Sequence, residues 1–245
     1  MVMSHPVEIL EYGNIKEFEH WLESGVDLNK AIWTAWYETR GGGKYISPLN
    51  YLALKIYGTF EIEIPLNTCS ESWFWFYFNR MKALLLKGVS TEVVVENGQT
   101  PLFYFCANNS VYDEEFKIRV IKLLIEHGAN VNATDSRGMT PLHCAASSGF
   151  AETARILLKH GADMLALNVD GRIPAHVTGT NPATEFLRQV LYAKAENCRD
   201  ILDAIGIGVE HNEIGGIPPD LIRIVLSNCR QYLHRYDILP PLPPP

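Results

Sequence analysis

The sequence predicts an all-α solenoid, built from about five helix-turn-helix repeats and a helical C-terminal extension. Two observations favour this fold. Residues 135–167 have the pattern of a tight turn, two short helices and a terminating glycine, and parts of this pattern recur along the chain at similar intervals. The chain of 245 residues is 47% hydrophobic and 20% charged, which is typical of a globular protein.

The first half of residues 135–167 has the signals of a turn followed by a helix. Gly138 suits a tight turn that needs a positive φ. Thr140 can cap a helix N-terminus, and Pro141 fits the first helical turn, where no backbone donor is lost. Ala145 and Ala146 would let a second helix approach closely. We therefore expect a helix that begins at Pro141 and packs tightly against a neighbour.

The second half of the same stretch predicts a second helix. Leu157 and Leu158 supply its apolar stripe, and Gly161 would end it in the left-handed conformation common at helix C-termini. We expect the ring of His143, in the first helix, to hydrogen-bond the neighbouring turn. It cannot form a nucleophile–base pair with Cys144, because adjacent helical residues point in different directions.

The positions that define this stretch recur on both sides of it. Downstream, the counterparts of its turn glycine, proline and histidine are all displaced by one constant interval: Gly171, Pro174 and His176. Upstream, Gly128 precedes Gly161 by the same interval. A constant interval of about 33 residues is long enough for one helix-turn-helix unit, so the recurrence predicts stacked repeats.

One upstream repeat is longer than the others. The stretch from Pro101 to Gly128 is seven residues longer than the equivalent stretch from Pro141 to Gly161. Since both ends of the repeat keep their signals, we expect the insertion between its helices, around residues 108–115.

A second insertion and a first repeat complete the count of five. Pro48 and Gly88 are twice as far apart in the chain as Pro141 and Gly161, which leaves room for an extra helix-sized segment, expected over residues 57–72. Gly13 and Gly25 have the same separation as the two glycines that flank the second helix of the best repeat. We therefore expect a first repeat at the N-terminus.

Residues 140–145, TPLHCA, and the turn and glycines around them resemble the signature of the ankyrin repeat. The resemblance implies a binding protein without enzymatic activity or cofactor, whose partner is another protein. Ankyrin proteins usually bind through their turn tips and the concave face of their first helices. The positions that correspond to these surfaces, and are therefore partner-binding candidates, are Thr134, Ser136, Arg137, Met139, Ser147, Ser148, Glu96, Asn97, Gln99, Asn108, Asp170 and Arg172.

Residues 73–78, WFWFYF, are six consecutive aromatic residues. At about 100° per residue they would point all round a helix, so they cannot all face one core. Two explanations stay open. The inserted segment 57–72 folds over them, or they form a partner-binding surface in which Trp and Tyr are anchors.

Composition excludes several classes of function. A net charge of −7 argues against a general binder of nucleic acid or anionic membranes. The five cysteines have no metal-binding spacing and are expected to be reduced thiols, so no metal is predicted. The first residues lack the pattern of a signal peptide, and no apolar run is long enough for a transmembrane helix. The expected location is the cytoplasm or nucleus, or a host cytosol if the protein is a secreted effector.

The predicted organisation has four parts. They are a repeat solenoid over residues 1–180, a capping helix and linker over 181–214, a helical motif over 215–239, and a proline-rich tail over 240–245. The capping helix is expected at residues 184–205, where apolar residues recur at helical intervals. The tail is expected to adopt polyproline II.

The helical motif near the C-terminus has two partial resemblances. IPPDLIRIVLSNC, residues 217–229, is similar to the opening of an F-box, and the same helix also resembles a SOCS box. Either would make the chain a substrate adaptor that brings Skp1 or elongin-type subunits of a cullin-type ubiquitin ligase to a target. A plain capping helix is the third explanation. The ligase-recruitment candidates are Pro218, Leu221, Val225, Leu226 and Leu233.

Overall fold

The structure is a computed structural model, which describes residues 6–11, 13–30, 32–34, 44–57, 70–94, 97–107 and 114–196. The chain divides into two compact units, residues 1–130 and residues 131–245. Helices dominate the described part of both units, so the predicted repeat solenoid is confirmed.

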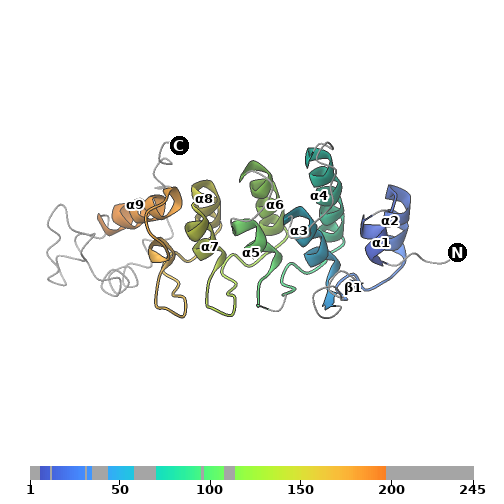
Figure 1. Cartoon of the computed structure of the whole chain (residues 1–245), viewed down its shortest axis with the longest axis horizontal. Coiled ribbons are helices and arrows are strands. Elements are labelled where there is room, and N and C mark those ends of the chain that lie inside the picture. Colours follow the sequence, from blue (N-terminus) through green and yellow to red (C-terminus); the bar gives the residue numbers. More distant parts are fainter. Residues whose placement is uncertain are drawn as a thin grey trace. The chain divides into compact units, whose positions relative to one another are not determined.

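The described part of residues 1–130 contains three helix pairs, each a first helix followed by a second (Figure 1). The pairs are α1 (Pro6–Glu11) with α2 (Ile15–Glu23), α3 (Pro48–Tyr57) with α4 (Ser70–Leu86), and α5 (Pro101–Cys106) with α6 (Glu114–Glu126). The two helices of each pair are in contact, and α3 also contacts α1 and α5. The first helices of this unit therefore form one layer, and every residue of the short helix α5 is buried.

The expected first repeat is the pair α1–α2. Asn14 begins α2 with a capping box, in which its side chain accepts a hydrogen bond from the Glu17 backbone N–H at 3.0 Å. The Glu17 carboxylate accepts one in return from the Asn14 N–H, also at 3.0 Å. Two of the backbone donors that every helix N-terminus leaves unsatisfied are thus paired locally.

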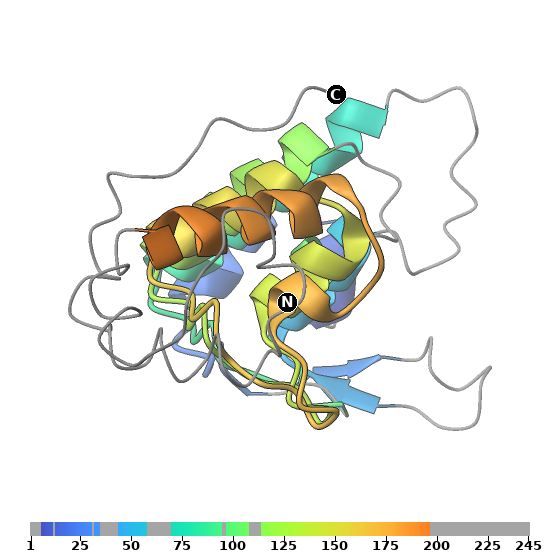
Figure 2. The ribbon, with the colours of Figure 1, turned by 90° about the vertical axis from the view of Figure 1, so that its left-hand side faces the viewer.

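A two-stranded hairpin adds to the helical architecture and was not expected from the sequence. β1 (Ile32–Thr34) and β2 (Lys44–Ile46) are antiparallel, with Trp33 opposite Tyr45 (Figure 2). Strands of this length carry too short an alternation to be recognised in a sequence. The hairpin stands at the turn that leads into α3, and β1 contacts α1.

The extra length of the second repeat lies partly in its helices. α3 has 10 residues and α4 has 17, whereas the equivalent helices of the best repeat have 8 and 9. The expected inserted segment, residues 57–72, therefore overlaps the end of α3 and the start of α4. Its central part, residues 58–69, lies outside the described residues, as do residues 108–113 of the shorter insertion.

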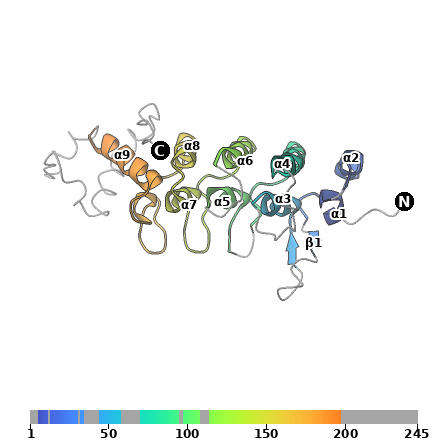
Figure 3. The ribbon, with the colours of Figure 1, turned by 45° about the horizontal axis from the view of Figure 1, so that its top comes forward.

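In residues 131–245 the best repeat has the predicted form. α7 (Pro141–Ser148) begins after Thr140, whose hydroxyl caps it, and α8 (Ala151–Lys159) follows (Figure 3). Gly138 and Gly161 have φ values of +68° and +88°, as expected for a turn and a helix end. The apolar positions predicted to pack between helices are all buried: Ala145, Ala146, Leu157 and Leu158.

The fifth repeat is irregular in its first helix and regular in its second. Pro174–His176 form only one turn of 3-10 helix, η2, and α9 (Pro182–Glu196) packs against η2, α7 and α8. Asn181 caps α9, because its Oδ1 accepts the Thr184 N–H at 2.9 Å. α9 covers much of the predicted capping helix, residues 184–205. The predicted boundary at residue 180 stays a prediction, and residues 197–245 lie outside the described part.

Candidate partner-binding surface

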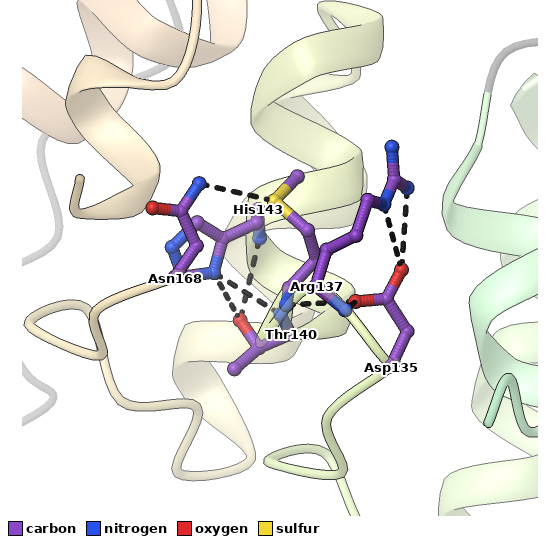
Figure 4. A network of polar contacts seen from close by, with 6 residues as sticks. Asp135, Arg137, Thr140, His143 and Asn168 are labelled. Atoms are coloured by element: carbon purple, nitrogen blue, oxygen red, sulfur yellow. Dashed lines mark hydrogen bonds and ion pairs between the residues drawn. The ribbon is translucent and has the colours of Figure 1, made fainter. Parts of the chain in front are cut away.

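The turn before α7 is organised around the buried carboxylate of Asp135 (Figure 4). One oxygen, Oδ1, accepts the backbone N–H groups of Arg137 and Met139, both at 2.9 Å. The other oxygen, Oδ2, accepts the Arg137 guanidinium at 3.2 Å. This is the Asx type of turn, in which a short side chain replaces a backbone acceptor. It leaves the Arg137 side chain 65% exposed on a loop whose backbone is held in place.

Asn168 does the same for the turn before η2. Its Oδ1 accepts the N–H groups of Asp170 at 3.0 Å and Arg172 at 2.9 Å. Its amide nitrogen donates to the sulfur of Met139 at 3.4 Å. Asp135 and Asn168 were not among the candidates. The signal that would have found them is their common position, third before the turn glycine.

The two turns are joined to each other through backbone groups. The Val169 N–H donates to the Arg137 carbonyl at 3.0 Å. Gly138 lies so close to the next turn that a Cβ placed on it would be 3.3 Å from the Asn168 Cα. Residues 134–139 and 167–172 therefore form one continuous strip of loop, which we call the turn strip.

His143 links the turn strip to α7, as predicted. Its Nδ1 lies 2.8 Å from the Thr140 hydroxyl and accepts the Thr140 N–H at 3.1 Å. Since Nε2 lies 3.0 Å from the Arg172 carbonyl oxygen, the proton of the neutral ring belongs on Nε2. Burial lowers the pKa of His143, although the Arg172 carbonyl and the carboxylates of Asp135 and Asp163 act in the opposite direction. The ring is thus a neutral structural group.

Cys144 has no features of a nucleophile. Burial raises the pKa of its thiol to about 12, so the reactive thiolate is essentially absent near neutral pH. In the described residues, no group of three or more His, Cys, Asp or Glu side chains could hold a metal ion. Within the same part of the chain, no helix has the length and apolar character needed to cross a bilayer.

Most described candidates reach solvent. Those that are exposed are Thr134, Ser136, Arg137, Ser147, Asn97, Asp170 and Arg172, and those that are half-buried are Ser148 and Gln99. The structure places all the exposed candidates except Asn97 in residues 131–196, and all of these except Ser147 on the turn strip. Asn97 and Gln99 belong to residues 1–130. Val169 joins the turn strip as a large apolar side chain that is 71% exposed.

The prediction that Met139 contacts a partner is wrong, because this residue is buried. Only 8% of its surface is exposed, because its side chain packs inward and its sulfur accepts a hydrogen bond from Asn168. A partner cannot reach it without opening the turn. Candidates outside the described residues are Glu96, Asn108 and all the ligase-recruitment positions, Pro218, Leu221, Val225, Leu226 and Leu233.

Comparison with known proteins gives one consistent result. A family model described as ankyrin repeats in three copies matches residues 76–168. The chain is 41% identical over 78 residues to a putative E3 ubiquitin-protein ligase, XBAT34, of Arabidopsis thaliana, covering 31% of this chain and 19% of that protein. It is 32% identical over 100 residues to the B-cell lymphoma 3 protein homolog of Mus musculus, covering 40% and 19%.

A viral protein gives a similar match. The chain is 38% identical over 68 residues to ankyrin repeat protein OPG189 of Monkeypox virus, covering 28% of this chain and 11% of that protein. The chain thus spans about a fifth or less of the length of these relatives. The matched region contains the capped helix α7 and the turn that precedes it, and residues 76–168 of the chain are ankyrin repeats.

Proposed function

We propose that this chain is a protein–protein interaction scaffold, which binds its partner through the turn strip and the adjoining face of the first helices. The observation that carries the proposal is that different side chains of the turns hold the backbone and face the solvent. The side-chain oxygens of Asp135 and Asn168 accept the backbone N–H groups of their turns. The neighbouring exposed side chains of the turn strip are not buried by any structural contact. No catalysis is assigned to the chain.

A fixed backbone favours binding. Loops that are already ordered lose less conformational entropy when a partner docks than loops that must become ordered. The turn strip offers Arg137 and Arg172 as cations, Asp170 as an anion and Val169 as an apolar contact. A partner surface that carries both signs of charge around an apolar spot would complement it.

Site-specific photocrosslinking tests the proposal. A photoreactive amino acid would replace Ser136 or Asp170 in the turn strip, or Lys159 at the end of α8 as a control, and the full chain would be irradiated in cells of its source organism. We expect the two turn-strip positions to trap the same protein and the control to trap none. Crosslinks that are absent from the turn strip, or equal at all three positions, would contradict the proposal.

A second candidate function is substrate adaptor for a cullin-type ubiquitin ligase, in which the repeats hold the substrate and residues 215–239 recruit Skp1 or elongin-type subunits. Two observations favour it. Residues 217–229 are similar to the opening of an F-box, and the helix with Val225, Cys229 and Leu233 resembles a SOCS box. Two relatives, XBAT34 and XBAT35, have names that describe putative E3 ubiquitin-protein ligases. If delivered into a host cell, such an adaptor would act as a pathogen effector.

Purification of tagged versions separates the two candidates. The full chain and a version that ends at residue 214 would be isolated from cells. The adaptor hypothesis requires Skp1 or elongin subunits to copurify only with the full chain, and their absence from both samples would refute it. Imaging of the same tagged chains tests the proposed cytoplasmic or nuclear location, which a membrane-enclosed signal would contradict.

A further inference from the structure

An open groove of about 490 Å³ runs between α4 and α6. Both helices belong to residues 1–130 and contact each other. One wall is the stripe Trp75, Phe78 and Lys82 of α4, and the other includes Ile118, Arg119 and Lys122 of α6. Since most members of each set lie three or four positions apart, each set occupies a single helix face.

The groove has an aromatic end that is only partly covered. Trp75 is 39% exposed, and its ring meets that of Phe78 edge to face, with centroids 5.5 Å apart. Behind them Phe74 is fully buried and packs against Phe116 of α6, with centroids 4.6 Å apart. The Trp75 ring also meets that of the buried Phe74 edge to face, with centroids 5.3 Å apart, so the indole rests on the core on one side and offers an apolar contact on the other.

One cation of the groove, Arg119, already contacts both an aromatic ring and a carboxylate. The Arg119 guanidinium lies 5.6 Å from the centroid of the Trp75 ring and donates to the Glu115 carboxylate at 2.7 Å. The guanidinium and carboxylate neutralise each other, and the stacking on the indole is a cation–π contact.

Two other cations of the groove have no carboxylate partner among the described residues. Lys82 and Lys122 are exposed on opposite walls, and neither forms an ion pair within the described part of the chain. Glu126 is the one remaining carboxylate among the described residues that line the groove, so the groove has a local excess of positive charge.

We propose that this groove is a second interaction surface, which binds a short peptide segment of a partner protein. The segment places a large apolar side chain against Trp75 and Phe78, and its carboxylates lie beside Lys82 and Lys122. These two properties of the peptide follow from the two ends of the groove. The aromatic end predicts an apolar side chain, because aromatic anchors supply much of the binding energy of interfaces. The lysines predict carboxylates, because opposite charges orient the bound segment. The groove is lined by residues of the second helices α4 and α6 and shares no residue with the turn strip.

Selection from a random peptide library tests this proposal without knowledge of the partner. Phage that display the library would be panned against the full chain, and an enriched peptide would be synthesised with a fluorescent label for anisotropy titration. We expect enriched peptides to combine a large apolar residue with Asp or Glu. Trp75→Ala should weaken binding at least tenfold, and Lys82→Glu with Lys122→Glu several-fold, with an affinity that falls as salt is added.

Matched variants make the result specific. Glu126→Gln should strengthen binding, because it removes a like charge from beside the bound carboxylates. Leu86→Ala changes an exposed residue of α4 that does not line the groove, and it should leave the affinity unchanged. Circular dichroism of each variant would confirm that it is folded, and Arg137→Ala in the turn strip should have no effect.

Four outcomes would overturn the proposal. They are the absence of any enriched peptide, enrichment of basic peptides, binding that Trp75→Ala does not weaken, and self-association in sedimentation experiments that Trp75→Ala abolishes, which would make a second copy the occupant. A separate test, with a contrary outcome of its own, replaces residues 58–69 with a Gly–Ser linker of equal length. If peptides bind only to that version, the chain itself competes for the groove and the proposal is wrong.

Discussion

Asp135 and Asn168 hold their turns with the same geometry, although one is charged and the other is neutral. In each turn a side-chain oxygen accepts two backbone N–H groups, from the second and fourth residues that follow it. The turn is therefore held by one side-chain oxygen atom, and the charge of the side chain is not required. The ion pair of Asp135 with the largely exposed Arg137 adds little, because solvent screens it.

Substitution of Asp135 tests this view. Asp135→Ala leaves two N–H groups without their acceptor and should lower the free energy of unfolding by about 2–4 kcal/mol. Asp135→Asn keeps an oxygen in the same place and should cost less than about 1 kcal/mol. Urea denaturation followed by circular dichroism would measure both. Equal losses for the two variants would show that the charge is what matters.

Gly138 and Gly171 form a second matched pair. Both have positive φ, +68° and +71°, so alanine at either position costs about 1–2 kcal/mol from the backbone alone. A Cβ on Gly138 would also press on the backbone of Asn168 and Val169 at 3.3 Å, whereas one on Gly171 would have nothing within 4 Å. We therefore expect Gly138→Ala to cost about 1–3 kcal/mol more than Gly171→Ala in the same denaturation experiment.

Burial of His143 predicts how stability depends on pH. Because burial lowers its pKa below the ordinary 6.5, the unfolded chain binds a proton that the folded chain does not, at pH values between the two. The free energy of unfolding should fall as the pH falls below about 7 and level off below the folded pKa. His176, whose pKa is also lowered by burial, acts in the same direction.

Thermal melts between pH 8 and pH 5 would measure this effect. His143→Gln removes one of the two groups, so its melting temperature should vary less with pH than that of the wild type, whatever its absolute value. An unchanged slope would show that the ring is not the source of the pH dependence.

At the scale of elements, α4 shows how a helix with aromatic residues on every side can be accommodated. Phe74 and Tyr77 are buried, and Phe76 is covered by the guanidinium of Arg80, whose carbon Cζ lies 3.8 Å from the ring centroid. Arg80 also lies over Phe18 of α2 at 4.9 Å and donates to the carbonyl oxygen of Gly13. One planar cation thus joins α4 to the first repeat.

Lysine cannot reproduce the contacts of Arg80, because an ammonium group is compact and cannot stack flat on a ring. Arg80→Lys should therefore lower the free energy of unfolding by about 1–3 kcal/mol. Lys82→Ala, further along the same helix and exposed, should change it by less than about 0.5 kcal/mol. Comparable effects of the two substitutions would argue against a bridging role for Arg80.

At the scale of the whole molecule, the tryptophans report on one part of the chain. All five lie in residues 1–130: Trp21, Trp33, Trp36, Trp73 and Trp75. The described part of that unit contains three helix pairs, and about three repeats are needed to bury a continuous core. In repeat proteins each repeat depends mainly on its neighbours, so local damage need not unfold the whole stack.

Gly138→Val tests this expectation, since a β-branched residue is strongly disfavoured at positive φ. We expect this variant to lose part of its helical circular dichroism at low urea while the tryptophan emission keeps its native wavelength. The wild type, denatured in parallel, serves as the reference. If both signals disappear together in the variant, the chain unfolds as a single cooperative unit.

Local backbone signals were predictable from the sequence alone. The cap at Thr140, the turn at Gly138 and the contact of His143 with Thr140 all depend on residues within a few positions of one another. Each such residue type has few backbone conformations or partners to choose from. The ankyrin fold followed because the same local signals recur.

Which surfaces remain open depends on how the folded segments pack. The burial of Met139, the contacts of Arg80 with Phe18 and Gly13, the β1–β2 hairpin and the groove beside Trp75 arise where different segments of the chain meet. Most of these outcomes depend on the packing of segments distant in sequence, which no periodicity encodes. The sequence alone therefore determined the scaffold and its turns, whereas the faces available for binding were decided by contacts between repeats.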